Sequence, residues 1–464
     1  MFRRLARFFG AQDMTVGSPM RSLLMFSIPL LIGNFAQQIY SATDSIVIGQ
    51  FDPSGANGLA AIGASMPILF LMLVFMMALS TGASVMVSQF FGAKDKETLS
   101  KTVGMSILSI LLISLFITAV GTILTRPLLS LIGTPEEIYD MAVAYLTIMF
   151  IGTIGNGLYN IISGILRGLG DSLTPLLFLL VCVALNIALD LLFVIRFGWG
   201  VAGVAWATII AQGISGVICL IRLCTMPDVV TIGFKQLRLF KDLMLRLIRI
   251  GVPSGLTQGI FSIAMLFTQS LTNSMGALVV ATSTAVMRVD GFAMLPNFTF
   301  GMAMSTFVGQ NVGACRMDRV VAGTKAGLKL TFLISAALTI MLVLFSQYLI
   351  ALFTPEPMIR ELGVRAVRIL AAGYVAMGIS QVFYGVMRGA GDTMTPMWTS
   401  IIITWVFRIP IAYAWAYLTR SDIWPNGSPD ALFGSMLIAW SLGCLLSYVL
   451  YRVGPWRKRA QTIR

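Results

Sequence analysis

The sequence predicts an all-α polytopic membrane protein with twelve transmembrane helices in two six-helix repeats. Two observations carry this prediction. The 464 residues are 57% hydrophobic and only 11% charged, which leaves too little polar surface for a water-exposed globule of this length. The stretch RGLGD at 167–171 also returns as RGAGD at 388–392, each copy followed by a Thr-Pro pair. We therefore expect a duplicated chain whose solvent is the lipid bilayer.

Apolar segments of about 20 residues or more recur along the chain, long enough to cross a hydrocarbon core about 30 Å thick as helices. The strict alternation of a membrane β-barrel is absent from the sequence. We predict twelve spans, near residues 21–48, 59–87, 102–124, 138–166, 174–195, 200–222, 247–272, 279–308, 326–353, 363–387, 394–418 and 432–452.

Lys and Arg are unevenly shared between the two ends of these spans. Of the 32 Lys and Arg residues, 23 fall on one side and six on the other, and an excess of basic residues marks the cytoplasmic side. We expect a multi-pass protein of the cytoplasmic (inner) membrane with both termini in the cytoplasm. The net charge of +13 follows from the same rule, so no nucleic-acid partner is predicted.

Three more pairs of matching segments support the duplication. They are Ile28-Pro29 with Val252-Pro253, residues 89–93 with 310–314, and residues 134–136 with 354–356. Six spans in each half give the second half the orientation of the first, as in transporters built from parallel repeats. The predicted domains are an amino-terminal lobe at 1–222, a basic cytoplasmic linker at 223–246 and a carboxy-terminal lobe at 247–464.

Several kinds of chemistry are excluded by composition. Histidine is absent, which removes Ser-His and Cys-His catalysis and HExxH zinc sites. The five cysteines have no metal-like spacing, and no GxxxxGK[ST] phosphate loop occurs. We therefore predict no enzyme activity and no cofactor.

Ionisable side chains inside a span are the strongest functional signal in a membrane protein, because each is costly unless it faces a cavity or a partner. Asp44 lies toward the outer end of the first span and Asp190 toward the outer end of the fifth, with Asn186 four residues before it on the same helix face. Two such carboxylates could share a proton or bind a small cation. The alternative is a pair of unrelated structural hydrogen bonds.

Other candidates lie in the second half and in the first span. Arg288 and Asp290 are two residues apart and face different sides of the eighth span, so each needs a partner on another helix. Their role could be functional, in gating or substrate contact, or structural, in joining the two halves. Arg408 is interpreted as structural. Pro29 removes a backbone hydrogen bond and could bend the span that bears Asp44, or could simply be tolerated near the start of that helix.

The chain resembles the multidrug and toxic compound extrusion (MATE) family over nearly its whole length. The resemblance rests on the twelve-span duplicated plan and the RGxGDxxTP turn in both halves. It also rests on Pro29 through DSIVIG at 44–49, on Asn186 to Asp190, on GVAGVA at 200–205 and on GQNVGA at 309–314.

The resemblance implies a V-shaped pair of six-helix lobes that exports organic cations or other xenobiotics in exchange for protons or sodium ions. It implies that Asp44, Asp190, Asn186 and Thr208 form the ion or proton site, with no metal beyond a sodium ion at Asp44 and Asp190. Pro29 would then act as a hinge in the first span.

One departure separates the chain from NorM-like members, which carry acidic residues in the seventh and tenth spans. Here the seventh span offers Gln258 and Gln269, and the core of the tenth offers no carboxylate. The chain is therefore expected closer to the DinF-like side, with Gln258, Gln269, Arg288 and Asp290 on the substrate path or in gating. The expected partners are small-molecule drugs and the bilayer, with the protein acting as a monomer. The alternative is a lipid-linked saccharide flippase of the same superfamily, which would need a wide cationic cavity.

Overall fold

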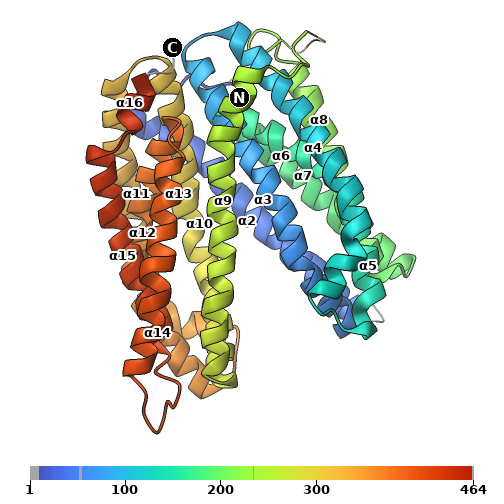
Figure 1. Cartoon of the computed structure of the whole chain (residues 1–464), viewed down its shortest axis with the longest axis vertical. Helices are drawn as coiled ribbons and strands as arrows, with labels where there is room; N and C mark the ends of the chain where they lie inside the picture. The colour runs from blue at the N-terminus through green and yellow to red at the C-terminus, as the bar shows by residue number, and fades with distance from the viewer. Residues whose placement is uncertain (1–9, 52–54, 232, 234, 462–464) are drawn as a thin grey trace. The chain divides into compact units, whose positions relative to one another are not determined.

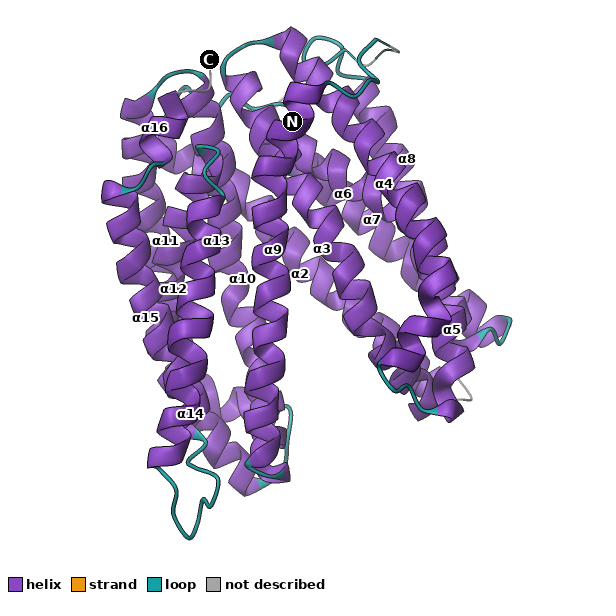
Figure 2. Cartoon of the chain, viewed as in Figure 1, coloured by secondary structure: helices purple, strands orange, loops and turns teal. Residues whose placement is uncertain are grey.

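The computed structural model describes residues 10–51, 55–231, 233 and 235–461. Within these residues the chain consists of helices joined by loops and turns and contains no strand (Figure 2). Residues 1–9, which contribute three arginines to the predicted cytoplasmic side, lie outside the described residues.

The helices of the first half follow the predicted spans closely. They are α2 (Pro19–Phe51), α3 (Ala56–Gly92), α4 (Lys96–Leu131), α5 (Glu136–Ile151), α6 (Thr153–Gly168), α7 (Leu173–Asp190) with the π-helical segment η1 (Leu191–Arg196), and α8 (Gly200–Cys224).

The second half repeats this order. It contains α9 (Lys241–Ser274), α10 (Ala277–Gly313), α11 (Met317–Ala351), α12 (Pro357–Gly389), α13 (Met394–Ile401) with the π-helical segment η2 (Ile402–Arg408), α14 (Ile409–Leu418), α15 (Asp430–Val453) and the short α16 (Trp456–Gln461).

Eleven described helices are long and apolar enough to cross a membrane, and α5 with α6 forms a twelfth span if the bent pair is counted as one. The pair bends by 48° at Gly152. A Cβ atom at Gly152 would lie 2.0 Å from Ile209 Cγ2 of α8, so only glycine allows this close approach. The structure confirms the prediction of an all-α protein with twelve spans, although the fourth span is bent.

By packing, the chain divides into two compact units. The first contains the residues up to Asp13 and Ile28–Gly255, and the second contains Met14–Ser27 and Leu256–Arg464. Both α2 and α9 therefore begin in one unit and continue in the other, and each has a proline close to the change of unit, Pro29 or Pro253. The domain boundaries predicted from the sequence repeat remain a prediction.

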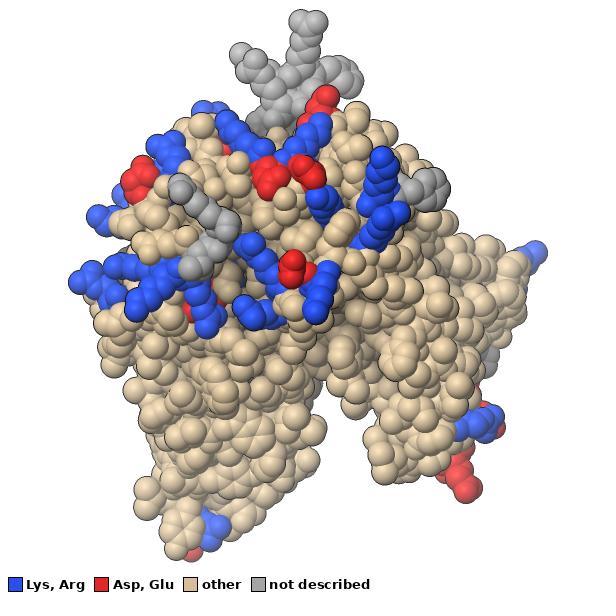
Figure 3. Space-filling view, turned by 45° about the horizontal axis from the view of Figure 1, so that its top comes forward, with Lys and Arg blue, Asp and Glu red and all other residues tan. Residues whose placement is uncertain are grey.

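In the second unit, α12 packs against α10, α11 and α15 (Figure 1). Its core contains Tyr374, Val367 and Leu370 of α12 together with Val286 of α10 and Phe433 of α15. Lys and Arg side chains gather at the end of this unit that carries α16 (Figure 3). That end is the one predicted to face the cytoplasm.

The duplicated glutamines at the ends of α3 and α10 each bind the segment that leads into the first span of the other half. Gln310 Oε1 accepts a hydrogen bond from the Met14 amide at 2.8 Å, and Gln89 Oε1 accepts one from Arg246 Nη2 at 2.5 Å. Gln310 thus attaches Met14 to the second unit, and Gln89 attaches Arg246 to the first.

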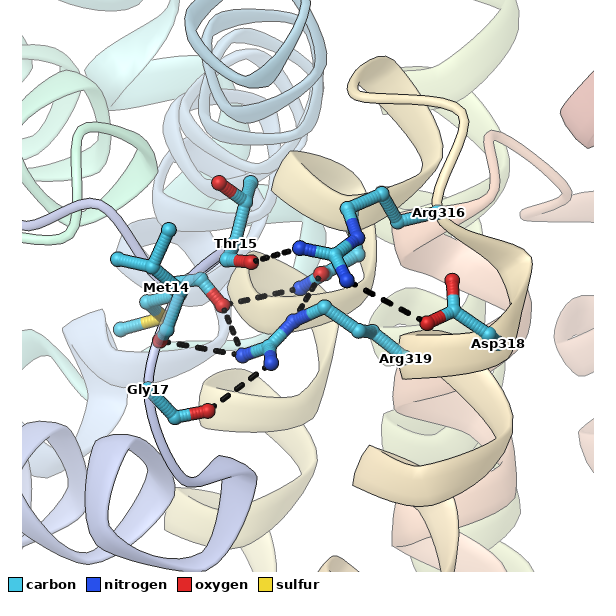
Figure 4. A network of polar contacts seen from close by, with 8 residues as sticks. Met14, Thr15, Gly17, Arg316, Asp318 and Arg319 are labelled. Carbon is cyan, nitrogen blue, oxygen red and sulfur yellow. Dashed lines mark hydrogen bonds and ion pairs between the residues drawn. The ribbon is translucent and has the colours of Figure 1, made fainter.

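Arg319 holds the segment before α2 within the second unit (Figure 4). Its guanidinium donates to the carbonyl oxygens of Met14 at 3.0 Å, Val16 at 3.1 Å and Gly17 at 2.9 Å. Arg316 adds a bond to Thr15 O at 3.1 Å. Met14 and Thr15 are buried, where a carbonyl without a donor is costly, so these two arginines fix the path of the chain into α2.

The two RGxGD turns have structural roles. Gly170 and Gly391 have φ values of +85° and +82°, which glycine adopts without strain. The following Asp171 accepts hydrogen bonds from the amide and hydroxyl of Thr174 at 3.0 and 2.6 Å, and Asp392 binds Thr395 in the same way. Each aspartate therefore caps the start of the next helix.

Candidate functional site

Asp44, Asn186 and Asp190 meet inside the first unit. Asp44 lies on α2, and the other two lie one turn apart at the end of α7. With its amide nitrogen turned toward the acids, Asn186 donates to Asp44 Oδ1 at 3.1 Å and to Asp190 Oδ2 at 3.2 Å. The two carboxyl groups also lie close enough to each other for an electrostatic interaction. The structure thus brings together three of the four residues predicted for the ion site.

The surroundings of the two carboxyl groups differ. Asp190 and Asn186 are completely buried, whereas Asp44 is partly exposed. Asp190 Oδ1 accepts no hydrogen bond within the described part of the chain. An unsatisfied buried acceptor next to a second acid is suited to holding a proton or a small cation.

Helix geometry changes immediately after Asp190. The α-helix ends at that residue and the π-helical η1 begins at Leu191, where Phe197 N donates to Leu192 O at 3.1 Å. Such π-helical segments are often found at functional sites. Here the change from α-helix to π-helix comes directly after Asp190, which bears the buried carboxyl group.

Thr208, the fourth predicted residue, contacts a tyrosine that lies near the two acids. Tyr40, one turn before Asp44 on α2, donates from its hydroxyl to Thr208 Oγ1 at 3.2 Å. Tyr145 of α5 lies close enough to Asp44 and Asp190 for an electrostatic interaction. Both tyrosines are buried, and neither is among the site residues predicted from the sequence. Tyr40 could have been found from its spacing of four from Asp44, which puts both on one helix face. No local pattern in the sequence points to Tyr145.

The described residues contain no group of three or more His, Cys, Asp or Glu side chains that could hold a metal ion. A sodium ion at Asp44 and Asp190 would be a transported ion, and the oxygen atoms of these two carboxyl groups are of the kind that hard cations prefer.

The second-half candidates do not form one cluster. Arg288 and Gln258 are exposed on α10 and α9, and Gln269 is exposed with its Nε2 donating to Asn273 Oδ1 at 2.8 Å. Asp290 accepts a hydrogen bond at Oδ1 from the Tyr374 hydroxyl at 2.8 Å. Arg288 and Asp290 thus have different environments, in line with their spacing of two on a helix.

Arg408 lies near Asp290, close enough for an electrostatic interaction. It is only 6% exposed and ends the π-helical η2. The sequence predicts a structural role for Arg408 and gives no indication that it lies near Asp290. The two residues are more than a hundred positions apart, so only the packing of α10 against α12 and its neighbours brings them together.

The duplicated helical plan and the buried carboxyl groups define a polytopic membrane protein built from two matching halves. The family model MatE matches residues 29–192 and 253–414. These matches cover more than half of the chain, one in each half. The chain belongs to the MatE family.

Three relatives illustrate its place in the family. The probable multidrug resistance protein YpnP of Bacillus subtilis is 32% identical, over 96% of this chain and 98% of the relative. The probable multidrug resistance protein NorM of Thermotoga maritima is 25% identical, over 96% and 94%. The multidrug export protein MepA of Staphylococcus aureus is 24% identical, over 91% and 90%.

Solved structures show the same fold. A structure described as MATE in the straight conformation superposes with a TM-score of 0.88 at 24% identity, over 97% of this chain and 98% of the other. A structure described as MATE in the bent conformation gives the same TM-score at 23% identity, over the same shares.

Proposed function

We propose that this protein is a secondary active antiporter that exports organic cations and other xenobiotics in exchange for protons or sodium ions, by alternating access. The observation that supports the proposal is the buried cluster of Asp44, Asn186 and Asp190. Three relatives across nearly the full length are described as multidrug resistance or export proteins.

The cluster is suited to ion exchange because the charge of its carboxyl pair can change with little movement of the side chains. Two neighbouring carboxyl groups in a poorly solvated site do not both ionise readily, so one proton or one cation satisfies the pair. Asn186 donates to both acids and can keep them in place in either state. Thr208 and Tyr40 border the cluster and complete the proposed ion site.

Pro29 is proposed as the hinge of this site. It lies inside α2, fifteen residues before Asp44, at the point where the helix passes from the second unit to the first. The missing amide hydrogen of Pro29 leaves the Met25 carbonyl without its helical partner. Bending at this point would move Asp44 relative to Asp190, and so would link helix geometry to ion binding.

Substrate contact is assigned to the second half. Gln258, Gln269, Arg288 and Asp290 offer polar side chains there, whereas the spans formed by α9 and α12 lack the core carboxylates expected of NorM-like members. For this reason we place the chain nearer to DinF-like than to NorM-like members. The proposal assigns it no catalytic step, no cofactor and no nucleic-acid partner.

We propose that the protein lies in the cytoplasmic membrane with both termini in the cytoplasm and works as a monomer. The uneven distribution of Lys and Arg supports this orientation. The flippase alternative gains no support, because the three relatives described above are named for multidrug resistance or export.

The proposal is tested with the purified protein in proteoliposomes, using ethidium as the probe. Accumulation is measured under a proton gradient alone, under a sodium gradient alone and with neither gradient. We expect accumulation under one of the two gradients and none without it. Equal ethidium movement in all three conditions would contradict antiport.

A further inference from the structure

An open pocket of about 680 Å³ lies at the end of the second unit that is predicted to face outward. It is formed by the last turns of α11, the turn that follows and the first four turns of α12. Its polar lining consists of Gln347, Arg360, Glu361, Arg365 and Arg368, and its apolar lining includes Pro355, Val364 and Ile369. The pocket wall therefore combines three arginines with apolar side chains.

The three arginines are unusual for their side of the membrane. Only six Lys and Arg residues were assigned to the outer side of the whole chain, and three of them line this one pocket. Basic residues normally avoid the outer side. Arg360 also lies in the first turn of α12, where the helix dipole is positive and a cation is disfavoured. This clustering needs a compensating negative charge.

The acidic residues near the pocket supply only part of that charge. Arg365 forms an ion pair with Asp430 at the start of α15. Among the described residues, Arg360 and Arg368 form no ion pair within 4.0 Å, and Glu361 is the only carboxylate in the lining. Arg360 and Arg368 are eight residues apart on α12, with Val364 midway, and therefore point to the same side of the helix.

Helix length places the pocket at the membrane boundary. The 33 residues of α12 span about 50 Å, or about 20 Å more than the hydrocarbon core. If this excess is shared equally, Arg360 lies at the level of the lipid headgroups. Arg368 then lies about 7 Å below that boundary, where a long side chain reaches back toward the headgroups. The two guanidinium groups thus bracket the depth at which lipid phosphates lie.

We propose that this pocket binds a phosphate-bearing anion, through Arg360 and Arg368, at the outer membrane surface. Guanidinium groups match phosphate oxygens in charge and in the geometry of their donors. The apolar wall formed by Val364, Ile369 and Pro355 is suited to the hydrocarbon next to an anionic phospholipid headgroup. This site is separate from the proposed ion and substrate sites and does not depend on the antiport proposal.

The test compares lipid binding by native mass spectrometry of the purified protein, with phosphatidylglycerol and phosphatidylcholine as probes. The double variant Arg360→Gln/Arg368→Gln should bind phosphatidylglycerol at least about tenfold more weakly, while its binding of phosphatidylcholine stays unchanged. The matched control is Arg126→Gln/Arg420→Gln, which removes the same charge from the same side without touching the pocket. It should bind phosphatidylglycerol as the unaltered protein does.

A second arm retains the charge and identifies the source of the anion. Arg360→Lys/Arg368→Lys should keep most of the phosphatidylglycerol binding, which separates charge from misfolding. Inorganic phosphate at about 10 mM is enough to fill a site that binds the free anion with a Kd of about 1 mM. It should leave lipid binding unchanged if a headgroup is the occupant, and reduce it if a soluble phosphate compound is. Unchanged phosphatidylglycerol binding by the glutamine variant, or an equal loss by the control, would overturn the proposal.

Discussion

Asn186 lies with its side-chain nitrogen 3.1 Å from Asp44 Oδ1, although the two residues belong to different helices. The same nitrogen reaches Asp190 at 3.2 Å. A neutral amide therefore links the two acids. It can keep donating to both when the charge of the pair changes, because its own charge does not.

Replacing Asn186 with leucine should strongly reduce gradient-driven ethidium accumulation. The substitution removes the donor shared by the two carboxyl groups, and an unsatisfied buried group costs about 1–3 kcal/mol. Asn160→Leu is the control, because the Asn160 side chain lies in the same unit and donates to Asn156 O and Oδ1 rather than to an acid. If Asn186→Leu transports at the rate of the control, Asn186 does not organise the site.

Replacing Pro29 with alanine should lower transport more than stability. Alanine restores the hydrogen bond to the Met25 carbonyl and favours a straight α2, so one access state becomes dominant. Transport and melting temperature are measured in parallel with Pro67→Ala, which alters a proline inside α3. Cysteines introduced near Asp44, in a variant without the native cysteines, should become accessible from one side only. Normal transport with unchanged labelling would reduce Pro29 to a tolerated residue near the helix start.

Gln258→Ala and Gln269→Ala should change which drugs are exported without changing the ion that drives export. Both side chains are exposed on α9, far along the chain from the carboxyl pair. Resistance to a panel of cationic and uncharged drugs is measured in cells, and ion dependence in proteoliposomes. A change of coupling ion in either variant, with none in Asp44→Asn, would contradict the proposed division of roles between the halves.

Arg319→Ala should destabilise the protein more than Arg316→Ala. The Arg319 side chain donates to three carbonyl oxygens of residues 14–17, whereas Arg316 donates to one and forms a surface ion pair with Asp318. A partly buried hydrogen bond to a charged group, such as that of Arg319 to Met14 O, contributes about 1.5–3 kcal/mol, the exposed bonds to Val16 and Gly17 add less, and exposed ion pairs contribute about 1 kcal/mol or less. Thermal unfolding in detergent compares the two variants. Equal melting temperatures would show that the segment before α2 is held by other contacts.

Much of this fold could be predicted from the sequence, because bilayer thickness sets the length of each span and the repeat sets the order of the spans. The bend at Gly152 could not, since it depends on contact with Ile209 of α8. Asp44, Asn186 and Asp190 were predictable because a polar residue inside an apolar span is conspicuous. Tyr145, Tyr374 and the proximity of Arg408 to Asp290 were not, because they arise from packing between distant helices.

The most direct test of the central proposal is the effect of Asp44→Asn and Asp190→Asn on gradient-driven ethidium accumulation in proteoliposomes. Asparagine keeps the shape and hydrogen bonding of the carboxyl group but cannot exchange a proton or neutralise a cation. Glu137→Gln, at an exposed acid on α5, is the control. We expect accumulation to be abolished in both aspartate variants and unchanged in the control, at matched amounts of folded protein. Accumulation at the unaltered rate in either aspartate variant would show that the carboxyl pair is not the coupling site.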